Sequence, residues 1–330
     1  MKLAVAILNW NGKKLLEEFL PFVIQHTKNA DIYVIDNASM DDSVSYLKAN
    51  YPSVKIVQNL GNYGFAKGYN EGLKHIDADI YCLLNSDVEV TANWTEPIME
   101  LFQKDQSIAA VQPKILDYKN KTHFEYAGAG GGYMDKFGYP FCRGRVFWTL
   151  EEDKGQYNDT VECFWATGAS LFIRKEDFFR QKGFDEDFFA HMEEIDLCWR
   201  LKNENRKIYY CGSSTVYHLG GGTLQKNNPR KTYLNFRNSL NMYLKNLPKD
   251  QLFPIIFSRL TLDGISAIVF MFYEGFGHLW AIFMSHMHFY RDFSKMYKKR
   301  GNHQIRNYGT KELIPFQYFV KKRQYFKDLK

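Results

Sequence analysis

The residues best suited to chemistry lie between Phe184 and Arg200, where six acidic side chains are interleaved with large apolar ones. A solvated acidic run would lack the aromatic residues, and a core segment would lack the carboxylates. Carboxylates held against apolar walls can act as general bases or bind cations. The segment therefore predicts a catalytic or cation-binding site built from these acids: Asp185, Glu186, Asp187, Glu193, Glu194 and Asp196.

Spacing separates the roles of these acids. On a helix, positions 193 and 196 share a face while 194 points elsewhere. Glu193, Glu194 and Asp196 are the three candidate general bases. One of Glu193 and Glu194 can face a site while the other makes a structural contact. Asp185 and Asp187 are predicted to cap the helix that the acidic segment opens, or to hold the loop.

A second polar group lies about a hundred residues upstream, where Asn85-Ser86-Asp87 directly follows the apolar run 80–84. Oxygen ligands suit a hard cation such as Mg²⁺ or Mn²⁺, which keeps part of its water while it bridges a diphosphate. Asp87 is predicted as a ligand and Asn85 as a weaker one; the alternative is a strand-end turn with Asp87 as a helix cap. His218, after a later strand, is predicted to bind the metal or a phosphate, with a structural role as its alternative.

Short apolar runs that alternate with helical patterns are predicted to position these groups. The alternation predicts a doubly wound α/β sheet flanked by helices, in which ligands bind at the carboxyl ends of the strands. Residues 115–160 are predicted to be irregular, with short strands, and the acidic segment is predicted to open a helix that reaches about residue 205. The expected strands are 3–8, 32–35, 54–57 and 80–84, and the expected helices are 13–26, 42–50 and 66–75.

Polar residues also follow the other predicted strands. Asn9 and Asp36 each come at a strand end, and Asp36 is predicted to accept hydrogen bonds from a nucleobase or ribose. The glycine-rich segment 59–72 enters a helix, and glycines at a helix N-terminus let a phosphate approach closely. The alternative for these glycines is a tight turn with close helix packing. The predicted donor contacts from this segment are Asn62, Gly64, Lys67 and Asn70.

Charge is unevenly distributed over the 330 residues, whose formal net charge is +6. Residues 1–230 carry 26 basic and 31 acidic side chains, whereas residues 231–330 carry 17 and 6. The basic C-terminal third predicts an anionic partner. Five cysteines without a C-x-x-C pair predict reduced thiols in the cytoplasm. The first residues run directly into a strand, so no cleavable signal peptide is expected.

Residues 241–330 are predicted to form a helical extension of a main domain, residues 1–240. The apolar stretch 252–290 is interrupted by charges, and its longest uncharged runs, 264–273 and 275–290, fall short of the ~20 residues of a spanning helix. Apolar helices with basic flanks predict peripheral association with an anionic membrane, at the inner face of the cell membrane. The alternative is an appendage that packs on the main domain or forms a homodimer contact.

Several of these segments, in this order, resemble glycosyltransferase family 2, and most closely its bacterial rhamnosyltransferase-like branch. The resemblance extends over roughly residues 1–240. It implies a GT-A fold, a nucleotide-diphosphate sugar donor, a Mg²⁺ or Mn²⁺ ion and inversion at the anomeric carbon. The segments that carry it are Asn9-Trp10-Asn11-Gly12, Val34-Ile35-Asp36-Asn37-Ala38-Ser39, Asn62 to Gly72, Leu84-Asn85-Ser86-Asp87, Gly168-Ala169 and Phe184-Asp185-Glu186 to Asp196-Leu197.

The resemblance also implies roles for single residues. Asp36 matches the family's base-binding Asp. Asn85-Ser86-Asp87 matches its D-x-D motif, with an Asn that removes one anionic metal ligand. Glu193-Glu194 matches its Glu-Asp pair, whose second member is the base, so the resemblance favours Glu194. Two arginines are candidate phosphate contacts or structural ion-pair partners: Arg200 and Arg237.

Together these features predict an inverting glycosyltransferase of cell-surface polysaccharide synthesis, with a glycan or lipid-linked glycan as acceptor and dTDP-rhamnose as a candidate donor. Nucleotidyltransferases use similar sheets, but residues 9–13 lack their basic, glycine-rich triphosphate signature. A catalytically inactive glycan-binding scaffold is the other alternative, left open by Asn85 and Glu194. Nucleic-acid binding is not expected, because the basic residues follow apolar helices instead of lining one polar face.

Overall fold

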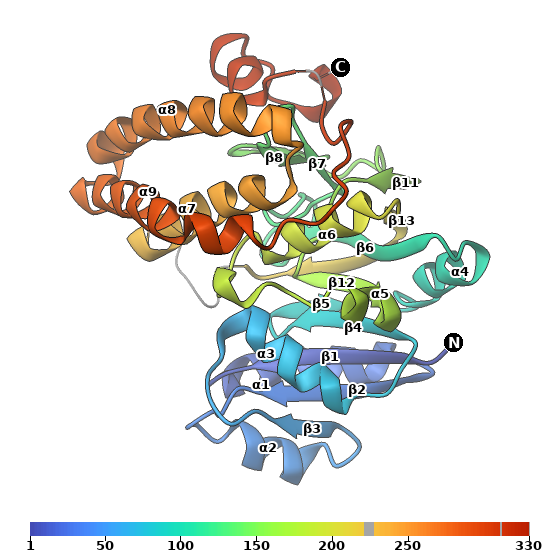
Figure 1. Cartoon of the computed structure of the whole chain (residues 1–330). Coiled ribbons are helices and arrows are strands. Elements are labelled where there is room, and N and C mark those ends of the chain that lie inside the picture. Colours follow the sequence, from blue (N-terminus) through green and yellow to red (C-terminus); the bar gives the residue numbers. More distant parts are fainter. Residues whose placement is uncertain (221–227, 311, 330) are drawn as a thin grey trace.

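The computed structural model describes residues 1–220, 228–310 and 312–329 (Figure 1). Within these residues the main sheet has nine strands in the order β11-β13-β6-β12-β4-β1-β2-β3, and β5 pairs with β13. Its strands are β1 (Leu3–Asn9), β2 (Ala30–Asp36), β3 (Lys55–Gln58), β4 (Ile80–Asn85), β5 (Val88–Val90), β6 (Ile108–Asp117), β11 (Thr160–Cys163), β12 (Ser170–Arg174) and β13 (Lys207–His218).

The part of the sheet built by the first four long strands is parallel. β1 pairs in parallel with β2 and with β4, and β2 pairs in parallel with β3. Beyond β4 the sheet is mixed, because β12 runs antiparallel to both β4 and β6. The predicted α/β class, a mixed sheet flanked by helices and followed by C-terminal helices, is confirmed.

Helices cover both faces of the sheet, because each strand directs alternate side chains to opposite faces. Leu3, Val5 and Ile7 of β1 belong to a core shared with α1, α2 and α4. Ala4 and Ala6 belong to the core on the other face, which includes side chains of α3, α5, α6 and α7. The first six helices are α1 (Lys13–His26), α2 (Ser43–Asn50), α3 (Gly64–Gly72), α4 (Glu96–Lys104), α5 (Lys175–Arg180) and α6 (Glu193–Asn203).

Residues 115–160 contain short strands in an irregular chain, as predicted. Four of these strands form a small antiparallel sheet in the order β10-β9-β8-β7. All five cysteines of the chain are buried and none forms a disulfide. The strands of the small sheet are β7 (Gly132–Met134), β8 (Pro140–Cys142), β9 (Arg145–Val146) and β10 (Thr149–Leu150).

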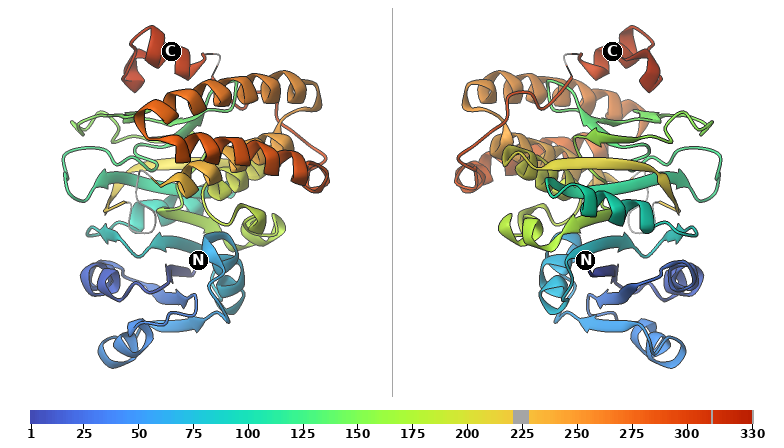
Figure 2. Two further views of the ribbon diagram at one scale, coloured as in Figure 1. Left: turned by 90° about the vertical axis from the view of Figure 1, so that its left-hand side faces the viewer. Right: turned by 90° about the vertical axis from the view of Figure 1, so that its right-hand side faces the viewer.

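Three long helices follow the main sheet: α7 (Pro229–Asn246), α8 (Lys249–Tyr273) and α9 (Phe276–Tyr297). The predicted division at residue 240 falls inside α7, which packs against α6 of the main domain as well as against α8 and α9. The last two helices form a hairpin whose turn projects beyond the sheet (Figures 1 and 2). This hairpin is called the α8–α9 hairpin below.

Among the described residues, α8 alone is long and apolar enough, by length and composition, to cross a membrane. The uncharged runs in the sequence pointed to shorter apolar segments, and that expectation was wrong for α8. The reason is an internal ion pair. Arg259 and Asp263, one turn apart, are both buried and lie 3.2 Å from each other, so α8 continues through them.

Candidate active site

The carboxyl ends of β1 and β2 bring Asn9 and Asp36 together, as the sequence predicts. The two residues are direct neighbours in the sheet register, and the Asn9 amide donates to Asp36 Oδ1 at 3.0 Å. Ser39 donates its backbone N–H to Asp36 Oδ2 at 2.9 Å, and both predicted residues are buried. Asn9 therefore orients the Asp36 carboxylate at the end of the sheet where a nucleotide is expected.

The glycine-rich segment packs closely against the acidic segment at the start of α3. The first amides of α3 are already occupied, because Phe65 donates its N–H to the carbonyl of Phe189 at 3.1 Å. Gly64 has a φ of 71°, and a Cβ there would lie 2.7 Å from the Phe189 ring. Asn62 accepts the Gly64 N–H at 3.0 Å. The N-terminus of α3 thus holds the acidic segment, which supports the alternative of a tight turn with close packing, and a donor contact from this segment stays a prediction.

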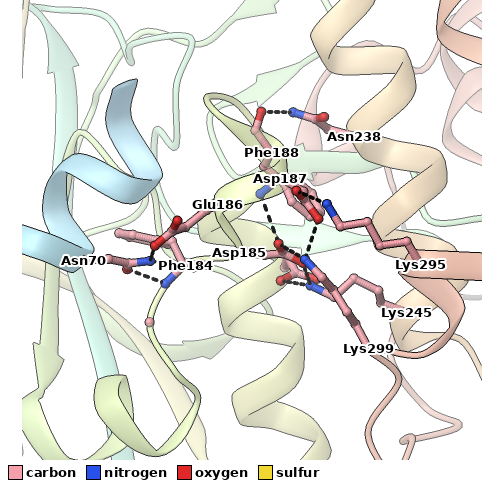
Figure 3. A network of polar contacts seen from close by, with 12 residues as sticks. Asn70, Phe184, Asp185, Glu186, Asp187, Phe188, Asn238, Lys245, Lys295 and Lys299 are labelled. Carbon is pink, nitrogen blue, oxygen red and sulfur yellow. Dashed lines mark hydrogen bonds and ion pairs between the residues drawn. The ribbon is translucent and has the colours of Figure 1, made fainter. Parts of the chain in front are cut away.

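Lys67 and Asn70 lie further along α3 and face the acidic segment. Asn70 is buried, donates to the carbonyl of Phe184 at 2.8 Å and accepts the Phe184 N–H at 2.9 Å (Figure 3). Its contacts give it a positioning role, and its direct contact with a donor stays a prediction. The Lys67 ammonium is partly exposed, 4.7 Å from the centre of the Tyr63 ring and 3.9 Å from Glu186.

The predicted metal ligands meet where β4, β5 and β13 converge. His218 Nε2 lies 3.2 Å from Asp87 Oδ1 and 3.5 Å from the Asn85 amide nitrogen. Glu125 lies on the other side of the imidazole, 3.3 Å from Nδ1. Burial alone lowers the pKa of His218, but its contacts with the Asp87 and Glu125 carboxylates outweigh burial and raise that pKa to about 10. Glu125 was missed by the sequence analysis, because nothing in its irregular surroundings marks it.

These residues suit a divalent cation that shares its coordination with a substrate. The part of the chain that the structure describes contains no group of three His, Cys, Asp or Glu side chains able to hold a metal alone. Asp87 and His218 nevertheless present an oxygen and a nitrogen to one point. Mg²⁺ in particular is commonly bound by one or two protein ligands plus substrate phosphates. A cation that also bound a donor diphosphate would fit this pair once His218 has released its proton, because an imidazole binds a metal only in its neutral form.

The acidic segment is a loop before it becomes a helix, so the expectation of a helix throughout it was wrong. Residues Glu186–Phe188 form a single 3₁₀ turn, and α6 begins only at Glu193. Three residues between them have positive φ: Phe189 at 64°, His191 at 69° and Met192 at 71°. Non-glycine residues rarely adopt this conformation, and clusters of it mark functional loops. We call residues 184–192 the acidic loop.

The two glutamates at the start of α6 have perturbed pKa values. Burial raises the pKa of Glu194 to about 7, although backbone amides at the start of the helix partly oppose the rise. Burial, followed by repulsion from Glu194, raises the pKa of Glu193 well above its usual value. Within the described residues, one carboxylate oxygen of each has no hydrogen-bond partner. Glu194 can thus exchange a proton near neutral pH, whereas burial and repulsion from Glu194 both disfavour the ionised form of Glu193.

The third acid of this helix, Asp196, is a structural residue. It is buried and accepts hydrogen bonds from Arg200 at 2.8 Å, Lys245 at 2.7 Å and Asn246 at 2.8 Å. Arg200 also donates to two backbone carbonyls, those of Gln181 and Gly183. These contacts support the structural alternative for Arg200.

Helix α7 clamps the acidic loop (Figure 3). The Asn238 amide nitrogen lies within hydrogen-bond distance of three loop carbonyls: those of Phe188 at 3.0 Å, Ala190 at 2.9 Å and His191 at 2.7 Å. Arg237 donates to the carbonyls of Asp187 at 2.8 Å and Phe188 at 3.2 Å. Arg237 thus supports the loop, and its predicted phosphate contact stays a prediction. The sequence analysis missed Asn238, because a mid-helix Asn carries no signal.

Lysines of α7 and of the segment that ends α9 neutralise the acidic loop (Figure 3). Lys245 lies 2.7 Å from Asp185, Lys295 lies 2.6 Å from Asp187, and Lys299 contacts both aspartates. Burial alone would raise the pKa of Asp185, but these lysines outweigh it and hold that pKa well below its usual range. Part of the C-terminal positive charge therefore has its anionic partner within this chain.

Gly168 and Ala169 connect the candidate cation site at the end of β4 with the glutamates at the start of α6. Asn85 donates its N–H to the carbonyl of Ala169 at 3.0 Å. A Cβ on Gly168 would lie 3.9 Å from the Glu194 Cβ and 3.0 Å from the Phe65 ring. This short segment therefore places the start of α6 beside the end of β4. The arrangement sets a carboxyl group that titrates near pH 7 beside the candidate cation site.

The combination of fold and site defines a class of protein. Residues 4–176, more than half of the chain, match the family described as Glycosyl transferase family 2, and the chain belongs to this family. Its fold is the GT-A fold of sugar transferases. Transfer of a sugar from a nucleotide donor is the activity that this membership supports.

Named relatives cover most of the chain at low identity. The chain is 23% identical over 244 residues to the low-salt glycan biosynthesis hexosyltransferase Agl10 of Haloferax volcanii, covering 72% of this chain and 73% of the relative. It is 23% identical over 233 residues to the N-acetylglucosaminyl-diphospho-decaprenol L-rhamnosyltransferase of Mycobacterium tuberculosis, covering 66% and 75%.

Two solved structures share the fold. The mannosyltransferase PcManGT of Pyrobaculum calidifontis, in complex with GDP-Man and Mn²⁺, has a TM-score of 0.51 at 13% identity, covering 89% of this chain and 75% of that chain. GalNAc-T7, solved with UDP, GalNAc and Mn²⁺, has a TM-score of 0.57 at 17% identity and covers 76% of this chain. The present chain spans about half, 48%, of GalNAc-T7.

Proposed function

We propose that this protein is an inverting, metal-dependent glycosyltransferase that transfers a hexose or deoxyhexose to a hydroxyl of a glycan or lipid-linked glycan. The observation that carries the proposal is the placement of Glu194, with a pKa of about 7, beside the strand that ends in Asn85. A general base is most effective when its pKa lies near the working pH. The L-rhamnosyltransferase among the relatives makes dTDP-rhamnose a candidate donor.

In this proposal Glu194 accepts the proton of the acceptor hydroxyl as its oxygen bonds to the anomeric carbon. The bond from that carbon to the diphosphate breaks on the opposite side, which inverts the configuration. Asp36, held by Asn9, contacts the nucleoside, and Asp87 with His218 would hold Mg²⁺ or Mn²⁺. The bound cation would offset the negative charge of the leaving diphosphate.

The proposed location is the inner face of the cell membrane, where the acceptor would be a growing lipid-linked glycan. Support comes from the excess of basic over acidic residues in the last hundred positions, 17 against 6. Three of these lysines are engaged by the acidic loop, and exposed lysines such as Lys298 and Lys322 remain available to an anionic surface.

The proposal is tested by measuring nucleoside diphosphate release from UDP-, GDP- and dTDP-sugars, with Mn²⁺ and with EDTA, and with a lipid-linked glycan as acceptor. Metal-dependent release from one donor is expected. Pyrophosphate release would instead identify a nucleotidyltransferase, and glycan binding without any release would identify a scaffold.

Matched variants locate the base. Glu194→Gln should lower transfer about 10²- to 10⁴-fold while nucleotide binding persists. Glu193→Gln, one residue away, should cost far less, because burial and repulsion from Glu194 disfavour the ionised form of Glu193 that a base needs. Near wild-type transfer by Glu194→Gln would refute the assignment.

A further inference from the structure

The α8–α9 hairpin has its polarity reversed relative to a helix pair on a water-soluble protein. A water-facing helix turns its polar residues outward and its apolar residues toward the core. Here the exposed positions recur every three or four residues and are apolar through most of both helices. Phe272 is 76% exposed and Trp280 is 52% exposed. The other large exposed apolar side chains of the hairpin are Phe253, Phe257, Ile265, Ile268, Val269, Tyr273, Phe276, Phe283, Met287, Tyr290, Phe293 and Tyr297.

Several polar residues of the hairpin lie on its inner side. Arg259 is buried, pairs with Asp263 and stacks on Tyr139, its guanidinium carbon 3.7 Å from the ring centre. On α9, His278 is buried, and its Nδ1 lies 2.9 Å from the Thr232 hydroxyl of α7. Burying charged and polar groups while exposing aromatic ones costs free energy in water. The same arrangement is favourable where the outer surroundings are less polar than the inner ones.

We propose that the outer face of the α8–α9 hairpin docks into the surface of an anionic lipid bilayer. This inference rests on the proposed function and adds to it the surface that makes the contact. Exposed Trp, Tyr and Phe side chains suit the boundary between headgroups and acyl chains. The turn carries one charged residue, the acidic Glu274. Basic side chains such as Lys298 gather after α9, as binding to an anionic headgroup layer requires.

The hairpin lies in the bilayer surface and does not cross the bilayer. By length α8 could span, since 25 residues extend about 37 Å. Contacts along both helices nevertheless hold the inner side of the hairpin against the rest of the protein. Arg259 of α8 stacks on Tyr139. On α9, His278 contacts Thr232 of α7. Because these contacts keep the inner side on the protein, only the outer face and the turn can enter lipid.

The composition of the exposed face favours a bilayer over a second copy of the chain as its occupant. α8 is apolar enough by composition to cross a membrane, and most of its residues are not buried, as expected of a helix that meets lipid. The hairpin itself carries four basic and four acidic side chains, so attraction to anionic lipid comes from the basic residues that follow it, such as Lys298. Docking there would also bring the acidic loop, through Lys295 and Lys299, to the lipid surface where a lipid-linked acceptor resides.

The test is sedimentation of the full chain with vesicles of phosphatidylcholine alone and of phosphatidylcholine mixed with phosphatidylglycerol. Wild type should bind the mixed vesicles more tightly. Phe272→Glu/Trp280→Glu should weaken that binding by at least about tenfold, because two exposed aromatic contacts are replaced by charges. Met40→Glu/Leu60→Glu is the matched control, since both residues are highly exposed apolar side chains in the N-terminal half. Its binding should fall by no more than about threefold, from charge alone.

Insertion can be mapped with a fluorescent thiol label, because all five native cysteines are buried. A polarity-sensitive dye on Phe272→Cys should shift to the blue and resist an aqueous quencher on mixed vesicles. The same dye on Met40→Cys should do neither. Thermal unfolding of each variant confirms that it folds.

Three results would overturn the proposal. They are no vesicle binding by wild type, equal binding by Phe272→Glu/Trp280→Glu, and a lipid-free dimer that the same substitutions convert to monomer in sedimentation velocity. Nucleoside diphosphate release from the donor, measured with a soluble acceptor, reports separately on the proposed function. Release without vesicle binding would refute the docking alone, whereas vesicle binding without release from any donor would count against the activity alone.

Discussion

Asn238→Ala is expected to uncouple catalysis from folding, because this side chain holds the acidic loop in its unusual conformation. The amide carries two hydrogens and lies within 3.0 Å of three loop carbonyls. Its oxygen also accepts from Arg237 at 2.7 Å. Leaving a buried carbonyl unsatisfied costs about 1–3 kcal/mol. Two lost hydrogen bonds therefore predict a loss of about 2–6 kcal/mol in local stability.

The acidic loop is expected to change conformation when the hydrogen bonds from Asn238 are lost. Phe189, His191 and Met192 have positive φ, and a non-glycine residue in such a region costs of order 1–3 kcal/mol. Relaxation of these residues would displace Glu194, which follows Met192 by two positions. A misplacement of about 1 Å at a reacting group can cost about 10²-fold in rate. We therefore expect kcat to fall about 10²-fold with little change in the donor KM.

The assay is steady-state kinetics beside thermal unfolding, with Asn246→Ala as the matched control. Asn246 is a buried Asn on the same helix, but it donates to Asp196 at 2.8 Å and does not touch the loop. The control should lose comparable stability and keep kcat within about threefold. An Asn238→Ala protein that is destabilised yet retains wild-type kcat would refute the positioning role.

Further predictions concern the base, the cation site and helix packing. The Glu194 pKa of about 7 predicts that kcat rises with pH through neutrality; a flat profile from pH 5.5 to 8 would contradict the base assignment. Because folding raises the Glu194 pKa from 4.5, the folded state favours the protonated carboxyl group, and the free energy of unfolding falls as pH rises through 7. Glu194→Gln should therefore raise Tm more at pH 8 than at pH 5.5. Glu125→Ala removes the partner of His218 Nδ1 and should weaken Mn²⁺ binding to the nucleotide complex about 10- to 100-fold by paramagnetic resonance titration; unchanged affinity would leave Glu125 outside the site. Gly72→Ala should cost about 1–3 kcal/mol in urea unfolding, since its Cβ would lie 2.4 Å from a β2 side chain, whereas Gly264→Ala has open space and should stabilise α8 by about 0.5–1 kcal/mol.

The neighbours at the nucleotide end of the sheet could be predicted from the sequence. Asn9, Asp36 and Asn85 each close an apolar strand. Parallel strands place their carboxyl ends at one edge, so residues that end such strands must lie near each other. The structure confirms the geometry, with Asn9 opposite Asp36 and Asn85 opposite Leu8 in the register. Their contacts with a donor stay predictions.

The acidic loop could not be predicted in the same way. Its carboxylates are typical of the first turn of a helix, which is why a helix was expected there. Positive φ at His191 and Met192 leaves no mark in residue type, because the contacts that stabilise it come from elsewhere. Asn238 lies about fifty residues further along the chain. The contact between Phe189 and the α3 amides could not be predicted for the same reason, since Phe189 reaches them only in the folded chain.

What the sequence determined by itself is the set of chemical groups, the order of strands and helices, and the basic, apolar character of the last hundred residues. These depend on residue type and short-range periodicity. What only the tertiary structure decided is which groups are partners. Lys245 and Lys299 neutralise Asp185, and Arg259 is buried with Asp263 while aromatic side chains face outward. Such pairings follow from how distant segments pack, because burial and charge depend on every neighbour in space and not on the neighbours in the chain.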